Sequence, residues 1–228
     1  MSGRLHFADA GEAADLAAFL ARLIHYDKAA AVRLQVHGDA VAVFGRPPSF
    51  EVLAIRTARL AKPYEYGLET SLDVTVSAGE LLESVGESAD AVETAGTAVV
   101  PGAVTGPPWA GVLPPRGGWQ QEPGLPGMVA LRGMVAGAVR EFRGRVEELA
   151  PELRVRAELD RVGREIWSRP VGDTGLPVRA AHAAQSLGFL RGESVDLLSA
   201  GNWLRLRTPY GSTAVRGAGL GPLSVAPV

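Results

Sequence analysis

The spacing of apolar residues near the N-terminus predicts an amphipathic helix from about residue 11 to residue 26. Its stripe consists of Leu16, Phe19, Leu20, Leu23 and Ile24. Asp9 and Glu12 precede it at the spacing of a capping box. Alternation with a period of two then predicts four antiparallel strands, at residues 32–37, 41–43, 52–57 and 72–76. Ser77 and Glu80 open a second, short helix.

The C-terminal half carries longer helical stripes. One helix is predicted from residue 128 to residue 149, and a second begins at Pro151. In the first, the spacing of Gly133 and Gly137 either allows close helix contact or reflects composition alone. Pro177 opens a third, short helix that ends near Leu187, with Gly188 as its left-handed cap. Strands at 195–198 and 203–208 then form a hairpin, and residues 213–216 add a third strand. Three helices followed by a hairpin is the element order of a winged helix.

Between these parts, residues 96–127 consist of glycine and proline for nearly half of their length. Proline removes a backbone donor and glycine raises the entropy lost on ordering, so we expect neither helix nor sheet there. Trp109 and Trp119 favour docking of this linker onto a neighbouring domain. The alternative is a proline-flanked aromatic motif presented to a partner.

These patterns predict an α+β fold in three parts. Residues 1–95 form a small layered subdomain of helix, antiparallel sheet and helix, and residues 96–127 form the docked linker. Residues 128–228 form a helical subdomain with a C-terminal β-hairpin. The charge changes at the same place, because residues 1–95 carry 8 basic and 14 acidic side chains and residues 128–228 carry 14 and 10.

The amino-acid composition excludes several kinds of chemical site. The absence of cysteine excludes disulfides, thiolate metal sites and thiol nucleophiles. No stretch has the length of apolar sequence that a membrane span requires, and no secretory signal is evident, so we expect a cytoplasmic protein. Arginine outnumbers lysine, of which Lys28 and Lys62 are the only examples. This ratio is typical of a GC-rich bacterial genome.

No motif for catalysis, cofactor binding or metal binding stands out. His25 and Asp27 are two positions apart on a helix and point away from each other, and His6 is expected in a frayed terminus. The glycine series at 217–221 lacks the following helix that a dinucleotide fingerprint needs. There is no P-loop and no nucleophile elbow. We therefore predict no catalytic residues, no metal site and no cofactor.

The C-terminal hairpin is the most distinctive candidate surface. Trp203, Arg205 and Arg207 alternate along one strand and share a face, where they suit phosphate contacts. Arg216 lies nearby, and Arg179 lies on the helix that would enter a DNA groove. That helix is otherwise mostly alanine, so base readout would be poor.

Three function classes stay open. We favour a non-enzymatic protein that acts through protein–protein contacts in an interaction or assembly role. It would bind an unknown protein partner and could form a homo-oligomer. The alternatives are a DNA-associated regulator that uses the C-terminal half, and an enzyme whose site lies between the halves. The candidate interaction surface comprises Trp109, Trp119, Trp203, Arg205, Arg207, Arg179 and Arg216.

Overall fold

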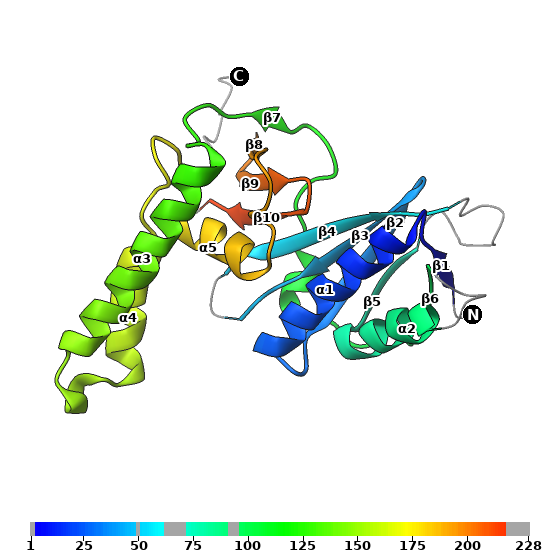
Figure 1. The fold of residues 1–228 in the computed structure, drawn as a ribbon, viewed down its shortest axis with the longest axis horizontal. Helices are drawn as coiled ribbons and strands as arrows, with labels where there is room; N and C mark the ends of the chain where they lie inside the picture. The colour runs from blue at the N-terminus through cyan, green and yellow to red at the C-terminus, as the bar shows by residue number, and fades with distance from the viewer. Residues whose placement is uncertain (1–2, 49–50, 62–71, 91–95, 218–228) are drawn as a thin grey trace, which may run out of the picture.

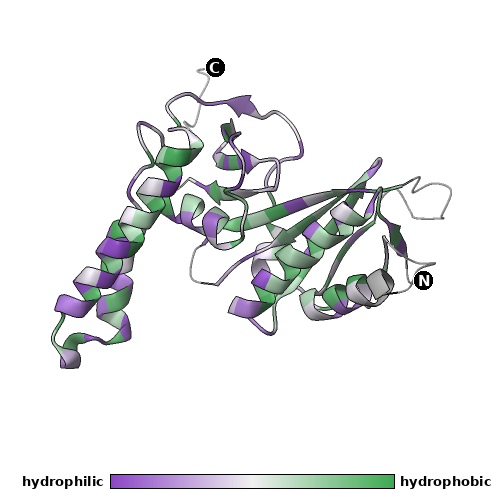
Figure 2. Ribbon diagram, in the orientation of Figure 1, coloured by the Kyte–Doolittle hydropathy of each residue, from purple (hydrophilic) through white to green (hydrophobic). Residues whose placement is uncertain are grey.

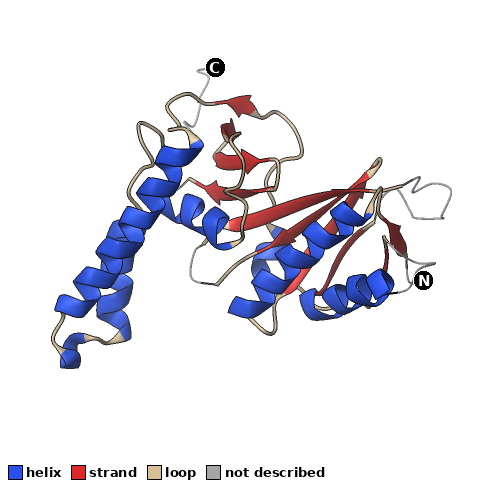
Figure 3. Ribbon diagram, viewed as in Figure 1, coloured by secondary structure: helices blue, strands red, loops and turns tan. Residues whose placement is uncertain are grey.

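A computed structural model describes residues 3–48, 51–61, 72–90 and 96–217 of the chain (Figure 1). It is a mixed fold of helices and antiparallel sheets, which confirms the predicted α+β class (Figure 3). The glycine series noted at 217–221 lies outside the described residues beyond Gly217.

An eight-stranded antiparallel sheet forms the centre of the fold. In spatial order its strands are β5 (Asp73–Ser77), β2 (Ala31–His37), β3 (Ala40–Gly45), β4 (Leu53–Arg59), β10 (Gly211–Arg216), β9 (Trp203–Thr208), β8 (Asp196–Ala200) and β7 (Gln120–Gln121). The four N-terminal strands lie where they were predicted, with shifts of a few residues at their ends, and burial alternates along β2 but not along β4.

The sheet joins the two halves of the chain through β4 and β10. Ser212 lies opposite Ile55, and Ala214 lies opposite Leu53. The C-terminal strands follow three helices, as predicted, but β10 lies between β9 and β4 and is a central strand. The hairpin is therefore part of the large sheet and does not project as a free wing.

Helices cover one face of this sheet. They are α1 (Ala10–Tyr26), α2 (Ala78–Asp90) and α5 (Val178–Ser186). Asp9 caps α1 by accepting the backbone N–H of Glu12 at 3.0 Å, as the capping-box spacing predicted. Leu20 of α1 is fully buried, and Phe19 meets Phe189 with ring centroids 5.7 Å apart. One continuous core thus runs under helices from both halves.

Two expectations about local order are wrong. His6 belongs to β1 (Arg4–His6), which pairs with β6 (Thr97–Val99) in a separate two-stranded sheet. The glycine- and proline-rich segment therefore contains a strand, and it also contains a 3₁₀ turn, η1 (Pro108–Gly111), and strand β7. Thr97 to Val99 precede the first proline of the segment, so their backbone donors remain free to pair.

The glycine- and proline-rich segment crosses the second face of the sheet, and we call residues 101–119 the strap. The N–H of Val104 donates to the carbonyl of Thr75 on β5 at 2.9 Å. Arg33 of β2 donates to the carbonyl of Ala110. Farther along, Trp109 and Leu113 pack against a small cluster of Phe44, Leu53, Ile55 and Ala214. The strap then leads into β7 at the opposite edge.

The helices α3 (Met128–Glu148) and α4 (Arg156–Trp167) form an antiparallel hairpin that we call the arm. In Figure 1 they lie side by side and extend away from the sheet. The fully buried residues of α3 all lie in its first half: Met128, Leu131 and Val135. Arg132 fixes this base by donating from Nε to the carbonyl of Leu190 at 2.9 Å.

The tip of the arm differs from its prediction. The second helix was expected to begin at Pro151, but residues 151–153 form a short 3₁₀ turn, η2, and α4 begins at Arg156. Arg154 donates from Nε to the carbonyl of Leu149 at 3.0 Å, and from Nη2 to that of Glu147 at 3.0 Å. This arginine satisfies the open end of α3, which favours a turn over continuous helix.

Candidate protein-interaction site

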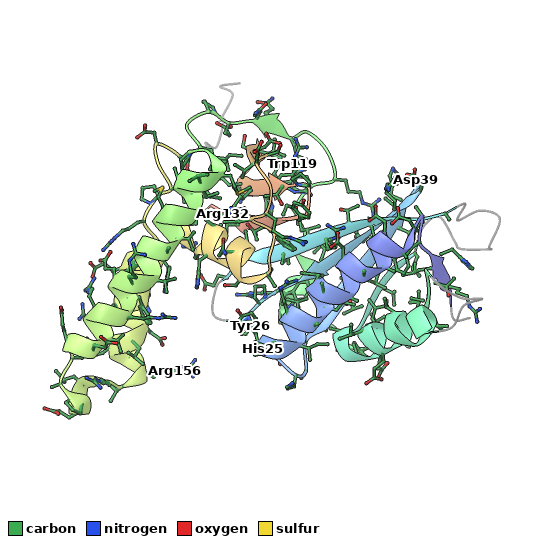
Figure 4. The ribbon with its side chains drawn as sticks, viewed as in Figure 1. His25, Tyr26, Asp39, Trp119, Arg132 and Arg156 are labelled. Carbon is green, nitrogen blue, oxygen red and sulfur yellow. The ribbon has the colours of Figure 1, made fainter. Side chains whose placement is uncertain are left out.

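The structure brings most of the predicted surface residues to the strap side of the sheet. Trp203, Arg205 and Arg207 share a face of β9, as predicted. Arg205 donates from Nε to the hydroxyl of Ser212 at 2.8 Å, and its guanidinium lies 5.6 Å from the ring centroid of Trp119. Trp119 is labelled in Figure 4. Burial, followed by the charge of Arg207, lowers the pKa of Arg205. Arg205 and Trp119 therefore hold the strap against the sheet.

Acidic side chains interrupt this basic surface. Arg207 forms an ion pair with Asp196, Nη2 to Oδ2 at 2.8 Å. Arg179 lies on α5, which packs against the opposite face of the sheet through a bond from the Thr213 hydroxyl to the carbonyl of Ala180. Arg216 is exposed at the end of β10. Arg179 is thus separated by the sheet from Arg205 and Arg207, and the three do not form one basic face.

The arm carries exposed apolar side chains whose exposure the sequence did not predict. Among the large hydrophobic residues that the structure describes, Val129 is 82% exposed, Leu153 50% and Val155 52%. Figure 2 shows apolar and polar residues mixed along both arm helices. Val129 lies at the base of α3, whereas Leu153 and Val155 lie together at the tip of the arm.

Four charged residues connect the two arm helices. Arg145 Nη1 lies 2.8 Å from Glu165 Oε1, and Arg169 Nη1 lies 2.6 Å from Glu141 Oε2. A further contact of 3.6 Å joins Arg169 to Glu165. The hydrogen bond from Arg145 lowers the pKa of Glu165, and the bond from Arg169 lowers that of Glu141. The network fixes the register of α3 against α4, with little stability from each exposed pair.

Three rings tie the arm to the body. Phe142 of α3 meets Trp167 of α4 with ring centroids 5.8 Å apart, and Trp167 stacks on His182 of α5 at 4.5 Å. Burial lowers the pKa of His182, so the neutral imidazole is favoured at neutral pH. This column gives the arm a defined orientation at its base.

Most residues on the outer face of α3 are exposed in the part of the chain that the structure describes. This face repeats at helical spacing and comprises Val129, Gly133, Ala136, Gly137, Arg140, Gly144 and Glu147. A Cβ atom added at Gly133, Gly137 or Gly144 would meet no atom within 4 Å among the described residues. The spacing of Gly133 and Gly137 indicated part of this face but did not predict its exposure.

Other site types receive less support from the geometry. An open cavity of about 480 Å³ on α4 is lined by Arg161, Arg164, Glu165, Ser168 and Arg169. A second, of about 410 Å³ near His25 and Tyr26 (Figure 4), is lined by Ala18, Ala21, Arg22, His25, Tyr26 and Ser186. Within the described residues no group of three or more His, Asp or Glu side chains could hold a metal ion. No helix in the same residues is long and apolar enough to cross a membrane.

Comparison with known families divides the chain at the strap. Residues 1–111 match the model of a domain of unknown function designated DUF8010, and residues 114–220 match that of a second, DUF8185. No curated protein matches the chain. The two matched ranges meet at residues 112–113, yet β4 of the first and β10 of the second are neighbours in one sheet. The chain is therefore similar to two families of unknown function.

Proposed function

We propose that this protein acts through protein–protein contacts in an interaction or assembly role, and that the arm is its binding surface. The observation that carries this proposal is the exposed outer face of α3, which leads to the exposed apolar tip. Val155 at that tip is 52% exposed, and Gly137 and Gly144 leave open space along the helix. Burial of such apolar surface is the main driving force of association.

The internal bonds of the arm favour binding because they limit the entropy lost when a partner docks. The ion pairs between α3 and α4 set their register, and the stacked rings of Trp167 and His182 set the orientation of the hairpin. A surface that is already ordered loses less conformational freedom on association than a flexible one. The hairpin strand β9 is a weaker candidate, because Asp196 already pairs with Arg207 and Trp119 lies over Arg205.

The test uses a variant that removes the exposed apolar group at the tip without harming the fold. Val155 is the N-cap residue of α4, with φ −88° and ψ 157°, and makes no side-chain capping bond. Asp is among the best N-cap residues, so Val155→Asp should preserve or stabilise α4. Val112→Asp is the matched control, because Val112 is 48% exposed on the strap.

The readout is the size distribution of the protein in extracts of its native cells, followed by gel filtration. We expect the unmodified chain and Val112→Asp to elute in a complex larger than 23.9 kDa. Val155→Asp should elute nearer the size of the free chain. If the unmodified protein eluted only as a free chain, or if both variants behaved alike, the arm would not be the binding surface.

A further inference from the structure

The charges on the distal half of α3 are arranged on either side of Gly144. Arg140 and Arg143 precede this glycine by one turn or less, and Glu147 and Glu148 follow it by about one turn. All four side chains are exposed. Within the part of the chain that the structure describes, none of them forms an ion pair, whereas Arg145, which points toward α4, does. Four unpaired charges therefore remain available to a partner.

This arrangement is self-complementary. If two copies of α3 lie antiparallel and cross at Gly144, Arg140 and Arg143 of each copy face Glu147 and Glu148 of the other. A two-fold axis repeats every such contact, as in an isologous dimer. We propose that the partner of the arm is a second copy of this chain, held through antiparallel α3 helices. This inference rests on the proposed role of the arm.

The shape of the outer face fits the same geometry. Gly144 at the crossing point has no side chain, and a Cβ there would meet no described atom within 4 Å, so two helix backbones can approach closely. Gly137 lies seven residues before the crossing, about 10 Å away at 1.5 Å per residue, and α3 ends at Glu148, about 6 Å after the crossing. The end of one α3 thus lies at the level of Arg140 on the other, and the tip with Leu153 and Val155 follows it.

Charge order favours a second copy over an unrelated partner. An unrelated helix would have to present an acidic pair and a basic pair with the opposite order and the same spacing. A second copy of α3 that runs antiparallel presents its acidic pair opposite the basic pair of the first copy, and its basic pair opposite the acidic pair. Opposite charges set the orientation, because a parallel pairing would bring Arg140 against Arg140 and Glu147 against Glu147.

The experiment is a charge exchange followed by light scattering at several protein concentrations. The basic-pair variant carries Arg140→Glu and Arg143→Glu, and the acidic-pair variant carries Glu147→Arg and Glu148→Arg. The unmodified chain should shift from 23.9 kDa toward twice that mass as concentration rises. Each variant alone should self-associate at least about tenfold more weakly, because like charges then face each other across the axis.

An equimolar mixture of the two variants should recover the dimer, because each then faces opposite charges in the other. Arg46→Glu, a single reversal at an exposed residue after β3, should leave the unmodified behaviour unchanged. Gly144→Leu should fold at least as well as the parent, since leucine favours helix over glycine, but should block the close crossing.

The outcomes separate the two proposals. A chain that stays monomeric at all concentrations, variants that dimerise like the parent, or a mixture that stays monomeric would each overturn the second-copy proposal. If in addition Val155→Asp still abolished a complex in native extracts, the arm would bind a different protein and the proposed function would stand. If both experiments failed, the proposed role of the arm would fail with them.

Discussion

Replacing Phe142 by alanine should loosen the arm without unfolding the sheet. Phe142 lies in the half of α3 that has no fully buried residue. Its ring contacts Trp167 at 5.8 Å between centroids, and its edge lies 3.6 Å from where a Cβ of Gly163 would stand. Phe142 is the aromatic residue that α3 contributes to its contact with α4, so its loss acts on the arm before it acts on the body.

The magnitude follows from the buried area. A phenylalanine buries about 200 Å² when fully enclosed, and Phe142 is only partly buried, so we take about 100 Å² of apolar surface as lost. At about 25 cal/mol per Å² this gives about 2.5 kcal/mol for local opening of the arm. That corresponds to roughly a 60-fold rise in the opening equilibrium, since 1.4 kcal/mol is tenfold.

Hydrogen exchange followed by mass spectrometry measures this opening equilibrium directly. Peptides from the distal half of α3 and from α4 should exchange roughly 60-fold faster in Phe142→Ala, while peptides from β2, β3 and β4 keep their protection. Phe142→Leu is the control and should give a smaller change, because most of the apolar contact remains. Equal loss of protection in arm and sheet would show that the arm is not a separate unit of stability.

Two further predictions concern the body. Leu20→Ala should lower the free energy of unfolding by roughly 2–5 kcal/mol in a denaturant titration, because Leu20 is fully buried; a loss below about 0.5 kcal/mol would contradict that burial. Burial depresses the pKa of His182, so its folded form binds fewer protons than the unfolded chain below about pH 6.5. Stability that depends on His182 should therefore be complete above that pH and fall below it. An imidazole NMR titration that placed its pKa at or above the free value would refute this.

Periodicity predicted the local elements well. The stripe through Leu16 and Leu20 lies on α1, and the alternation at 32–37 lies on β2. These predictions succeeded because the period of the apolar residues along a helix or a half-buried strand reflects which of its faces is buried. Gly188 closes α5 with φ +74°, as its position after Leu187 predicted. These features depend on residues that are close together in the chain.

The pairing of strands that are far apart in the chain could not be predicted from the sequence in the same way. Pairing of β4 with β10 joins segments more than 150 residues apart, and no local pattern specifies a partner strand. The same limit applies to the arm. The apolar stripe of α3 has the same period whether it packs against the body or only against α4, so the exposed outer face became evident only from the fold. The role of Trp119 against Arg205 likewise depends on where the strap crosses the sheet.

Site-specific photo-crosslinking in the native cells tests the central claim most directly. A photoreactive amino acid is placed at Ala136 on the outer face of α3, with Val99 on β6 as a control that is 40% exposed. The account predicts a discrete protein adduct from Ala136 and none from Val99, and a second copy of the chain within that adduct. No discrete adduct at Ala136, or the same adduct from both positions, would contradict it.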